Sequence, residues 1–109
     1  MDKRDIHLSK LITSTEIDSI SGRKFGQDFA ETEGVLKLLE NGFIIKIIID
    51  DTKVKAINDS FWKGFLSKVF ERLKSKSEVN KLLEFDCNSS FKKQIDKNFE
   101  ILDSIYNES

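Results

Sequence analysis

The chain has 109 residues, one cysteine and a net charge of −1 at pH 7, and 39% of its residues are hydrophobic. A chain of this length has room for one hydrophobic core, so residues 1–109 are predicted to form a single domain. Basic and acidic residues are mixed along the sequence, which argues against nucleic acid as a partner. A lone cysteine cannot form an intramolecular disulfide, and no apolar run reaches the length of a signal peptide or a membrane span. We therefore expect a cytoplasmic protein with no membrane contact.

The first part of the chain is predicted to contain a strand, a turn region and a helix. Apolar residues alternate partially over residues 6–12, which predicts an early strand. A stretch rich in Ser, Thr and Asp follows, with a short strand expected at Ile17–Ile20. Apolar side chains then recur at helical spacing over residues 25–39. Asn41 and Gly42 predict the end of this helix, since glycine adopts the left-handed conformation at little cost.

The run Phe43-Ile44-Ile45-Lys46-Ile47-Ile48-Ile49 is the clearest element of the sequence. It is rich in β-branched residues, almost continuously apolar, and bounded by Gly42 and by Asp50-Asp51. Such a run predicts a central strand that is buried on both faces, beside a parallel strand and under helices. We expect this strand to lie inside a mixed sheet of about four strands.

The second half of the chain predicts two helices and a strand. An amphipathic helix is expected over residues 61–73, a strand at Val79–Cys87 and a terminal helix over residues 91–105. Gly64 interrupts the first of these helices, at a cost of about 1 kcal/mol relative to alanine. Close packing of this helix on the sheet would explain the glycine. The predicted fold class is α/β, with the helices packed mainly on one face of the sheet.

Few residues have the chemistry of a catalytic or metal site. His7 is the only histidine and Cys87 the only cysteine, and nothing near either residue supports a nucleophilic pair. The glycine patterns of nucleotide-binding loops are absent, and zinc ligands are too few. Asp50 and Asp51 are candidates for Mg²⁺, because ligands gather at the carboxyl edge of parallel sheets, although they would also simply end the strand. We predict no enzymatic activity and no cofactor.

The segment Asn58-Asp59-Ser60-Phe61-Trp62 is the most informative part of the sequence. Asn, Asp and Ser are all preferred helix N-caps, because each side chain accepts a hydrogen bond from an unpaired backbone N–H. A helix N-terminus also favours negative charge, and Trp is enriched at binding hot spots. We predict that these five residues form a partner-binding site. The alternative is a capped helix in which Trp62 belongs to the core.

Three segments of the chain carry a resemblance to a known family. They are Ser21-Gly22-Arg23-Lys24-Phe25-Gly26 at the first helix, Ile47-Ile48-Ile49-Asp50-Asp51 in the strand, and Ile57-Asn58-Asp59-Ser60-Phe61 at the second helix. As a set they resemble the STAS-like domain family, relatives of the STAS fold of anti-sigma factor antagonists. With the terminal helix, the resemblance covers the chain from about Ile17 onward. It implies a STAS-like fold and a regulatory module that binds a protein, with a kinase-like ATPase as one candidate partner.

The sequence departs from the antagonists at one position of this motif. Antagonists carry Asp-Ser-Ser-Gly where this chain has Asn58-Asp59-Ser60-Phe61. In that alignment the serine that antagonists phosphorylate corresponds to Asp59, and Ser60 corresponds to its neighbour. The resemblance therefore implies a fixed negative charge at Asp59. Ser60 remains a candidate phosphorylation or anion site.

Three hypotheses for function follow from the sequence. The preferred one is a non-enzymatic regulatory or interaction module that binds a protein partner through residues 53–62. The second is a phage or mobile-element protein that binds and inhibits a host defence factor, which the size and composition permit equally. The third is a sensor of a nucleotide or small ligand that uses the edge formed by Asp50 and Ser60. The sequence does not predict the oligomeric state.

Overall fold

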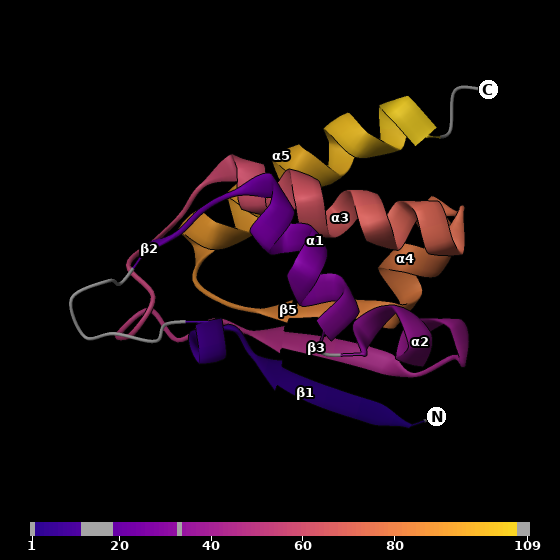
Figure 1. Cartoon of the computed structure of the whole chain (residues 1–109), viewed down its shortest axis with the longest axis horizontal. Helices are drawn as coiled ribbons and strands as arrows, with labels where there is room; N and C mark the ends of the chain where they lie inside the picture. The colour runs from indigo at the N-terminus through magenta and orange to yellow at the C-terminus, as the bar shows by residue number, and fades with distance from the viewer. Residues whose placement is uncertain (1, 12–18, 33, 107–109) are drawn as a thin grey trace.

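The computed structural model describes residues 2–11, 19–32 and 34–106, which form an α/β fold (Figure 1). The elements in chain order are β1 (Lys3–His7), the 3-10 helix η1 (Leu8–Leu11), β2 (Ser19–Ile20), α1 (Arg23–Thr32), α2 (Val35–Glu40), β3 (Ile44–Ile48), β4 (Ala56–Ile57), α3 (Asp59–Leu73), α4 (Lys76–Leu82), β5 (Leu83–Asp86) and α5 (Ser89–Tyr106). None of the helices in these ranges is both long enough and apolar enough to cross a membrane.

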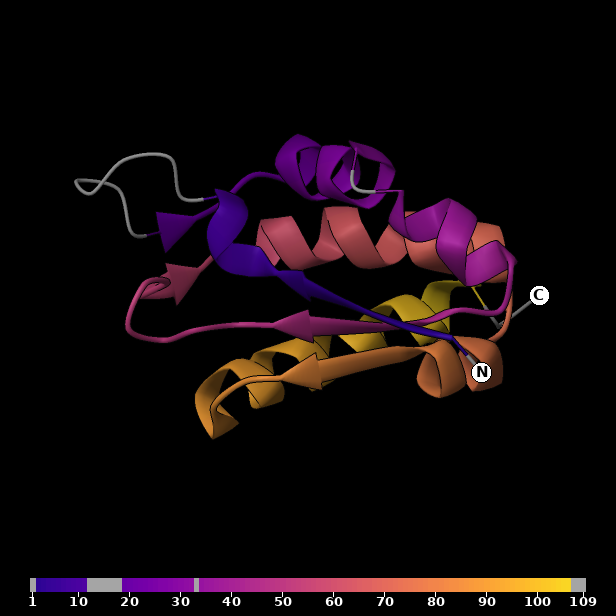
Figure 2. The same cartoon turned by 90° about the horizontal axis from the view of Figure 1, so that it is seen from below.

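The strands form two separate ladders, and both are parallel. The main sheet has the order β1-β3-β5, and β2 pairs with β4 in a second, shorter ladder. Figure 2 shows β2 and β4 beyond the carboxyl ends of the main strands. The expected mixed sheet of about four strands is therefore wrong for the described residues, which contain a three-stranded parallel sheet. The expectation of β3 as its central strand is confirmed.

The helices lie on one face of the main sheet. Figure 1 shows α1, α3 and α5 above the three strands. The side chains of β3 that point toward the helices, Ile45 and Ile47, have no exposed surface. In register with Ile47, Ile6 comes from β1 and Phe85 from β5. This face of the sheet and the helix α3 build one hydrophobic core.

The other face of the main sheet carries charged side chains, which corrects the expectation that β3 is buried on both faces. Ile44, Lys46 and Ile48 are only half-buried there. Two ion pairs cross the strands on this face, Lys3 Nζ–Glu84 Oε1 at 3.1 Å and Lys46 Nζ–Asp86 Oδ2 at 3.9 Å. The aliphatic stems of such long side chains cover neighbouring apolar residues while their charges stay in water. A continuous apolar run was therefore no proof of burial on both sides.

Three further sequence predictions need correction. The early strand expected over residues 6–12 lies at Lys3–His7, and Leu8–Leu11 form the 3-10 helix η1. The helix expected over residues 25–39 is divided at Gly34, whose φ of 72° is left-handed and therefore ends regular helix. The strand expected at Val79–Cys87 begins only at Leu83, because the preceding residues form α4. Ser75 caps α4 by accepting a hydrogen bond from the Glu78 N–H, and Val79 and Leu82 share its buried face.

Helices α1 and α3 cross at two glycines, which gives Gly64 a different role from the one predicted. A Cβ atom on Gly64 would lie 1.9 Å from the carbonyl oxygen of Arg23 in α1. A Cβ atom on Gly26 would lie 2.1 Å from the carbonyl oxygen of Phe61 in α3. Gly64 therefore permits close packing of helix on helix, not of helix on sheet. The two backbones approach so closely that neither position accepts a side chain.

Candidate functional site

The second ladder places the starts of α1 and α3 next to each other. Ile20 of β2 pairs with Ile57 of β4, and the Asn58 N–H donates to the Ile20 carbonyl at 2.7 Å. Each strand leads directly into a helix, β2 into α1 and β4 into α3. Because the ladder is parallel, both helices begin at the same end of the molecule (Figure 1). Two segments that are far apart in the sequence thus meet at one place.

Asn58 is the N-cap of α3. It is one of the three residues that the sequence offers as candidate caps of this helix. Its Oδ1 accepts a hydrogen bond from the Ser60 N–H at 2.9 Å, and its extended backbone is typical of the cap position. The Ser60 hydroxyl has another role, since its Oγ accepts a hydrogen bond from the Gly22 N–H at 3.1 Å. Gly22 has a φ of 108°, in the region that favours glycine. Ser60 thereby connects the start of α3 to the start of α1.

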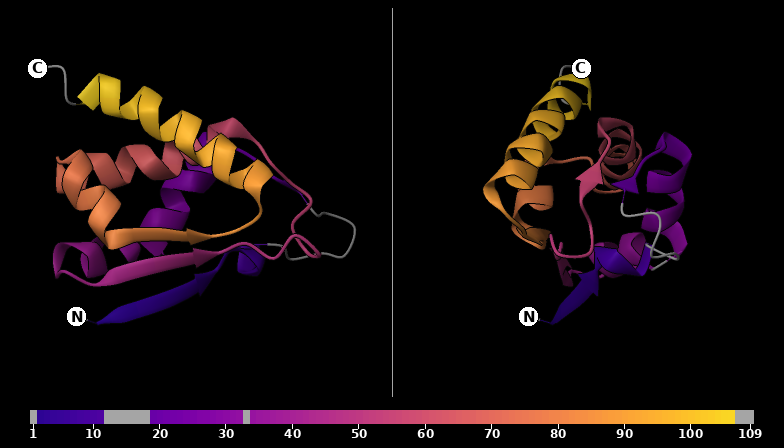
Figure 3. Two further views of the ribbon diagram at one scale, coloured as in Figure 1. Left: turned by 180° about the vertical axis from the view of Figure 1, so that it is seen from behind. Right: turned by 90° about the vertical axis from the view of Figure 1, so that its left-hand side faces the viewer.

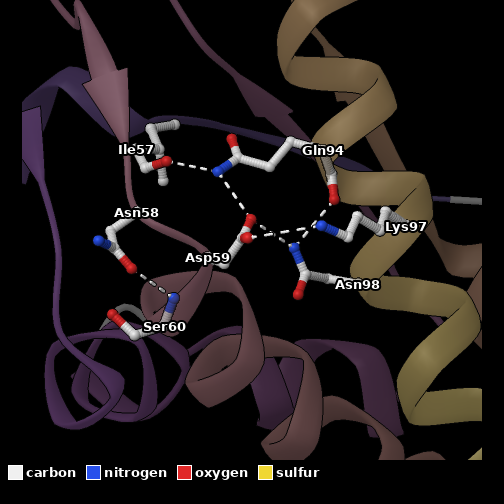
Figure 4. Close-up of polar contacts among 7 residues, drawn as sticks. All are labelled: Ile57, Asn58, Asp59, Ser60, Gln94, Lys97 and Asn98. Carbon is white, nitrogen blue, oxygen red and sulfur yellow. Dashed lines mark hydrogen bonds and ion pairs between the residues drawn. The ribbon is translucent and has the colours of Figure 1, made fainter.

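Asp59 is held by the terminal helix (Figure 4). Its Oδ1 accepts hydrogen bonds from Gln94 Nε2 at 3.0 Å and from Asn98 Nδ2 at 3.1 Å. The Lys97 ammonium lies 4.0 Å from Oδ2. The Gln94 amide also donates to the Ile57 carbonyl, so α5 holds both the end of β4 and the start of α3. Figure 3 shows the path of α5 across α3 that makes these contacts.

The surroundings of Asp59 favour its ionised form. The hydrogen bonds from Gln94 and then Asn98 lower the pKa of Asp59 below its ordinary value, with smaller contributions from Lys97 and Lys63, against a partial desolvation. The carboxylate also lies in the first turn of α3, where the helix dipole favours an anion. Asp59 is thus a permanent negative charge, as the resemblance implied. Its partners, however, belong to the same chain.

Phe61 and Trp62 are core residues, which corrects the expectation that they contact a partner. Neither side chain has exposed surface. The Trp62 ring contacts the rings of Phe61, Phe65 and Phe85 edge-on, at centroid distances of 5.2 to 6.2 Å. Trp62 Nε1 is buried without a hydrogen-bond partner among the described residues, as is Asn98 Oδ1. The predicted partner-binding set therefore keeps only its polar members, Asn58 to Ser60, at the surface.

Asp50 and Asp51 stabilise the loop after β3. Asp50 Oδ1 accepts hydrogen bonds from the backbone N–H and the hydroxyl of Thr52, at 3.0 and 2.6 Å, and these bonds lower the pKa of Asp50. Asp51 Oδ2 accepts a hydrogen bond from Asn88 Nδ2 at 3.2 Å. In the part of the chain that the structure describes, no three His, Cys, Asp or Glu side chains are placed to bind a metal ion. The two aspartates act here as turn-forming residues.

His7 and Cys87 stand at the ends of the two outer strands of the main sheet. Because β3 lies between β1 and β5, their backbones are about 10 Å apart, twice the spacing of paired strands. Burial raises the pKa of the Cys87 thiol, which disfavours the reactive thiolate. This arrangement does not form a nucleophilic pair.

Sequence reasoning missed Gln94 and Asn98 and did not predict that Phe25 is exposed. Phe25 was counted with the buried face of the first helix, yet 37% of it is exposed. Its ring meets the Phe61 ring edge-on at 6.0 Å, directly beside the start of α3. Asn98 had a signal in the sequence, since it occupies the apolar face of the terminal helix between Ile95 and Leu102. A lone amide on such a face indicates a specific polar partner.

We name the two joined helix starts, Ser21–Phe25 and Asn58–Ser60, the helix-start surface. All of its described side chains are exposed or half-exposed. The loop that precedes β4 adds Lys53 and Lys55, both exposed, on either side of the buried Val54.

Comparison with known proteins finds no matching family model, no matching curated protein and no matching solved structure. The function is therefore inferred from this surface.

Proposed function

We propose that this chain is a non-enzymatic interaction module that binds a protein partner through the helix-start surface and the adjacent loop. The observation that carries the proposal is the hydrogen bond from the Gly22 N–H to Ser60 Oγ, which spans 38 positions in the sequence. It joins the two segments whose motifs resemble those of STAS-like domains. A surface assembled from two such motifs is a better candidate for recognition than either helix start alone.

The distribution of rigid and accessible groups supports this proposal. Beneath the surface, Gly26 and Gly64 hold the two helices in close contact, and Phe61 and Trp62 fill the core. Above it, Arg23, Lys24 and Asn58 present polar groups to solvent. Binding residues on a rigid scaffold lose little entropy when a partner docks. The resemblance to STAS-like domains suggests a regulatory protein, such as a kinase-like ATPase, as that partner.

We further propose that the surface is constant and not switched by phosphorylation. Asp59 supplies a negative charge at all physiological pH values, and the Ser60 hydroxyl already accepts the Gly22 N–H. Intact-mass measurement of the protein from its native cells should therefore give the unmodified mass. An added phosphate on Ser60 would contradict this part of the proposal.

Affinity capture with matched charge variants tests the main proposal. The site variant Lys53→Glu with Lys55→Glu reverses two exposed cations of the loop. The control variant Lys37→Glu with Lys81→Glu makes the same change in net charge on α2 and α4, at the other end of the sheet (Figure 1). We expect one specific protein to be captured by the wild type and the control, and lost with the site variant. Equal capture by both variants would refute the proposal.

The identity of the captured protein separates the first two functional hypotheses. A regulatory ATPase supports the regulatory module, and a host defence protein supports the inhibitor. Residues 53–60 would be used in both cases, so the same variants serve both tests.

A further inference from the structure

The helix-start surface carries two exposed cations at the start of α1, Arg23 and Lys24, although the chain as a whole is slightly acidic. Five cations lie on or beside this surface, namely Arg23, Lys24, Lys53, Lys55 and Lys63, against the four carboxylates of Asp28, Asp50, Asp51 and Asp59. The net charge of the chain is −1, so the rest of the molecule is acidic. The Asp59 carboxylate keeps its negative charge, but its Oδ1 already accepts hydrogen bonds from Gln94 and Asn98 of α5. Exposed cations favour a partner that brings a charge of the opposite sign.

The cations of the first helix are placed where a partner can reach them. Arg23 and Lys24 are exposed in the first turn of α1, which contains no acidic residue. Lys24 lies 3.5 Å from Asp28, with 86% and 51% of the two side chains exposed. Such an exposed pair is weak and exchanges readily for another carboxylate. Cations at a helix N-terminus are also unfavourable for the isolated helix, and an acidic ligand would relieve this.

Phe25 adds an apolar contact point within this surface. It is one of three large hydrophobic residues that are exposed in the described part of the chain, and the other two are on α5. Gly22, next to the Phe25 side chain, has no side chain to cover it. The underlying Phe61 ring holds the Phe25 ring from below. An apolar side chain of a partner could therefore pack on Phe25 between the cations.

From this juxtaposition we infer that the helix-start surface binds an acidic protein segment that carries an apolar side chain, with its carboxylates at Arg23 and Lys24 and its apolar group on Phe25. The inference rests on the proposed function and names the chemistry of the partner. A nucleic acid fits less well, because a slightly acidic chain repels a polyanion and five cations form a small footprint.

The test selects ligands for the wild-type protein from a random dodecapeptide library displayed on phage. Enriched peptides are then synthesised, and their affinities are measured by fluorescence anisotropy. We expect peptides with net negative charge and at least one aliphatic or aromatic residue. Their affinity should fall when NaCl is raised well above 0.1 M, where the screening length is about 10 Å.

Matched variants show which residues of the protein bind the selected peptides. Arg23→Glu with Lys24→Glu should weaken the peptides about tenfold or more, since both charge contacts become repulsive. Phe25→Ser should weaken them by a similar factor. The controls are Lys37→Glu with Lys81→Glu, and Ile105→Ser, which removes an apolar residue that is 64% exposed near the far end of α5. Neither control should change the affinity. Circular dichroism checks that each variant folds.

The outcomes separate the inference from the proposed function. Two outcomes would overturn the inference and leave the interaction surface standing. In the first, the peptides depend on Phe25 but are neutral or basic. In the second, they bind the double variant Arg23→Glu with Lys24→Glu at unchanged affinity. Peptides whose binding depends on none of the site variants would overturn the inference and count against the surface itself. Displacement of the acidic peptides by a short oligonucleotide at lower concentration would assign the surface to nucleic acid instead.

Discussion

The two flanks of α3 are held by opposite means. On the side of α1, the contact is between backbones: Gly26 and Gly64 leave no room for a side chain. On the side of α5, amide donors surround the Asp59 carboxylate at the start of α3, and Phe70 packs on Phe99 and Tyr106 farther along. The first flank derives its strength from close packing, which depends on shape, and the second from hydrogen bonds, which water can partly replace. The same helix start thus meets a close backbone contact on the side of α1 and a polar network on the side of α5.

The largest effect on the free energy of unfolding is expected in the hydrophobic core, which lies beneath both flanks of α3. Trp62→Ala should lower the free energy of unfolding by about 3–5 kcal/mol, because the buried indole leaves a cavity. Chemical denaturation measures this loss. A loss below about 1 kcal/mol would mean that Trp62 is not a core residue in solution, and would return it to the candidate partner-binding set.

A new methyl group tests the flank at α1. Gly64→Ala should destabilise the protein by about 3 kcal/mol, since Cβ would meet the Arg23 carbonyl oxygen and the helices must separate. The gain in helix propensity, about 1 kcal/mol, offsets only part of this loss. Gly34→Ala is the control: nothing lies within 4 Å of its Cβ, so only the left-handed backbone contributes, about 1–2 kcal/mol. Equal losses in the two variants would show that the crossing is not tightly packed.

A change of charge without a change of shape tests the flank at α5. Asn98→Asp places a second carboxylate beside Asp59 in a position with no exposed surface. We expect a loss of about 2–3 kcal/mol at pH 7, because an unpaired buried charge is unfavourable. The loss should shrink as the pH falls and the new carboxyl takes up a proton. Asn98→Leu, which carries no charge, is the matched control; its loss should change with pH only at the acid end, where Asp59 itself takes up a proton.

Removal of the Asp59 charge should have a smaller effect. The pKa of Asp59 is lower in the folded protein than its ordinary value of 3.8, so its ionised form stabilises the fold above that pH. This contribution disappears as the pH falls through the folded-state pKa. Because 41% of the Asp59 side chain is exposed, Asp59→Asn should cost below about 1 kcal/mol at pH 7. Urea denaturation of both proteins from pH 7 to pH 2 should show the difference vanish at the acid end; a constant difference would contradict the role of the charge.

The smallest effect on the free energy of unfolding is expected for the hydrogen bond between Gly22 and Ser60, which joins the two helix starts. Ser60→Ala removes the acceptor of the Gly22 N–H, but this group is half-exposed and water can replace the hydroxyl. The free energy of unfolding should fall by about 0.5 kcal/mol. Hydrogen exchange at the Gly22 amide should nevertheless accelerate, while exchange in α5 stays the same. An unchanged Gly22 amide would mean that the Ser60 hydroxyl does not connect the helices.

Local signals in the sequence predicted much of the fold. The capping residues before α3, the β-branched run of β3 and the helical spacing of the terminal helix each depend on neighbours in the chain, so periodicity and cap chemistry revealed them. Asn58 as a cap and β3 as the central strand are examples. The boundary of β5 was wrong because Val79 and Leu82 fit the buried face of a short helix as well as a strand.

Only the tertiary structure decided which contacts each of several consecutive residues makes. Asp59, Ser60 and Phe61 are consecutive, yet they turn to α5, to α1 and to the core, because successive helix residues point about 100° apart. The parallel pairing of β2 with β4 brings Phe25 and Ser60 to one surface, and no local pattern encodes such a long-range contact. Likewise, the ion pairs on the outer face of the main sheet, Lys3–Glu84 and Lys46–Asp86, join residues of different strands. The sequence by itself determined the central strand β3, the helices α3 and α5 and the Asn58 cap, which depend on local patterns; the contacts between elements determined the surface.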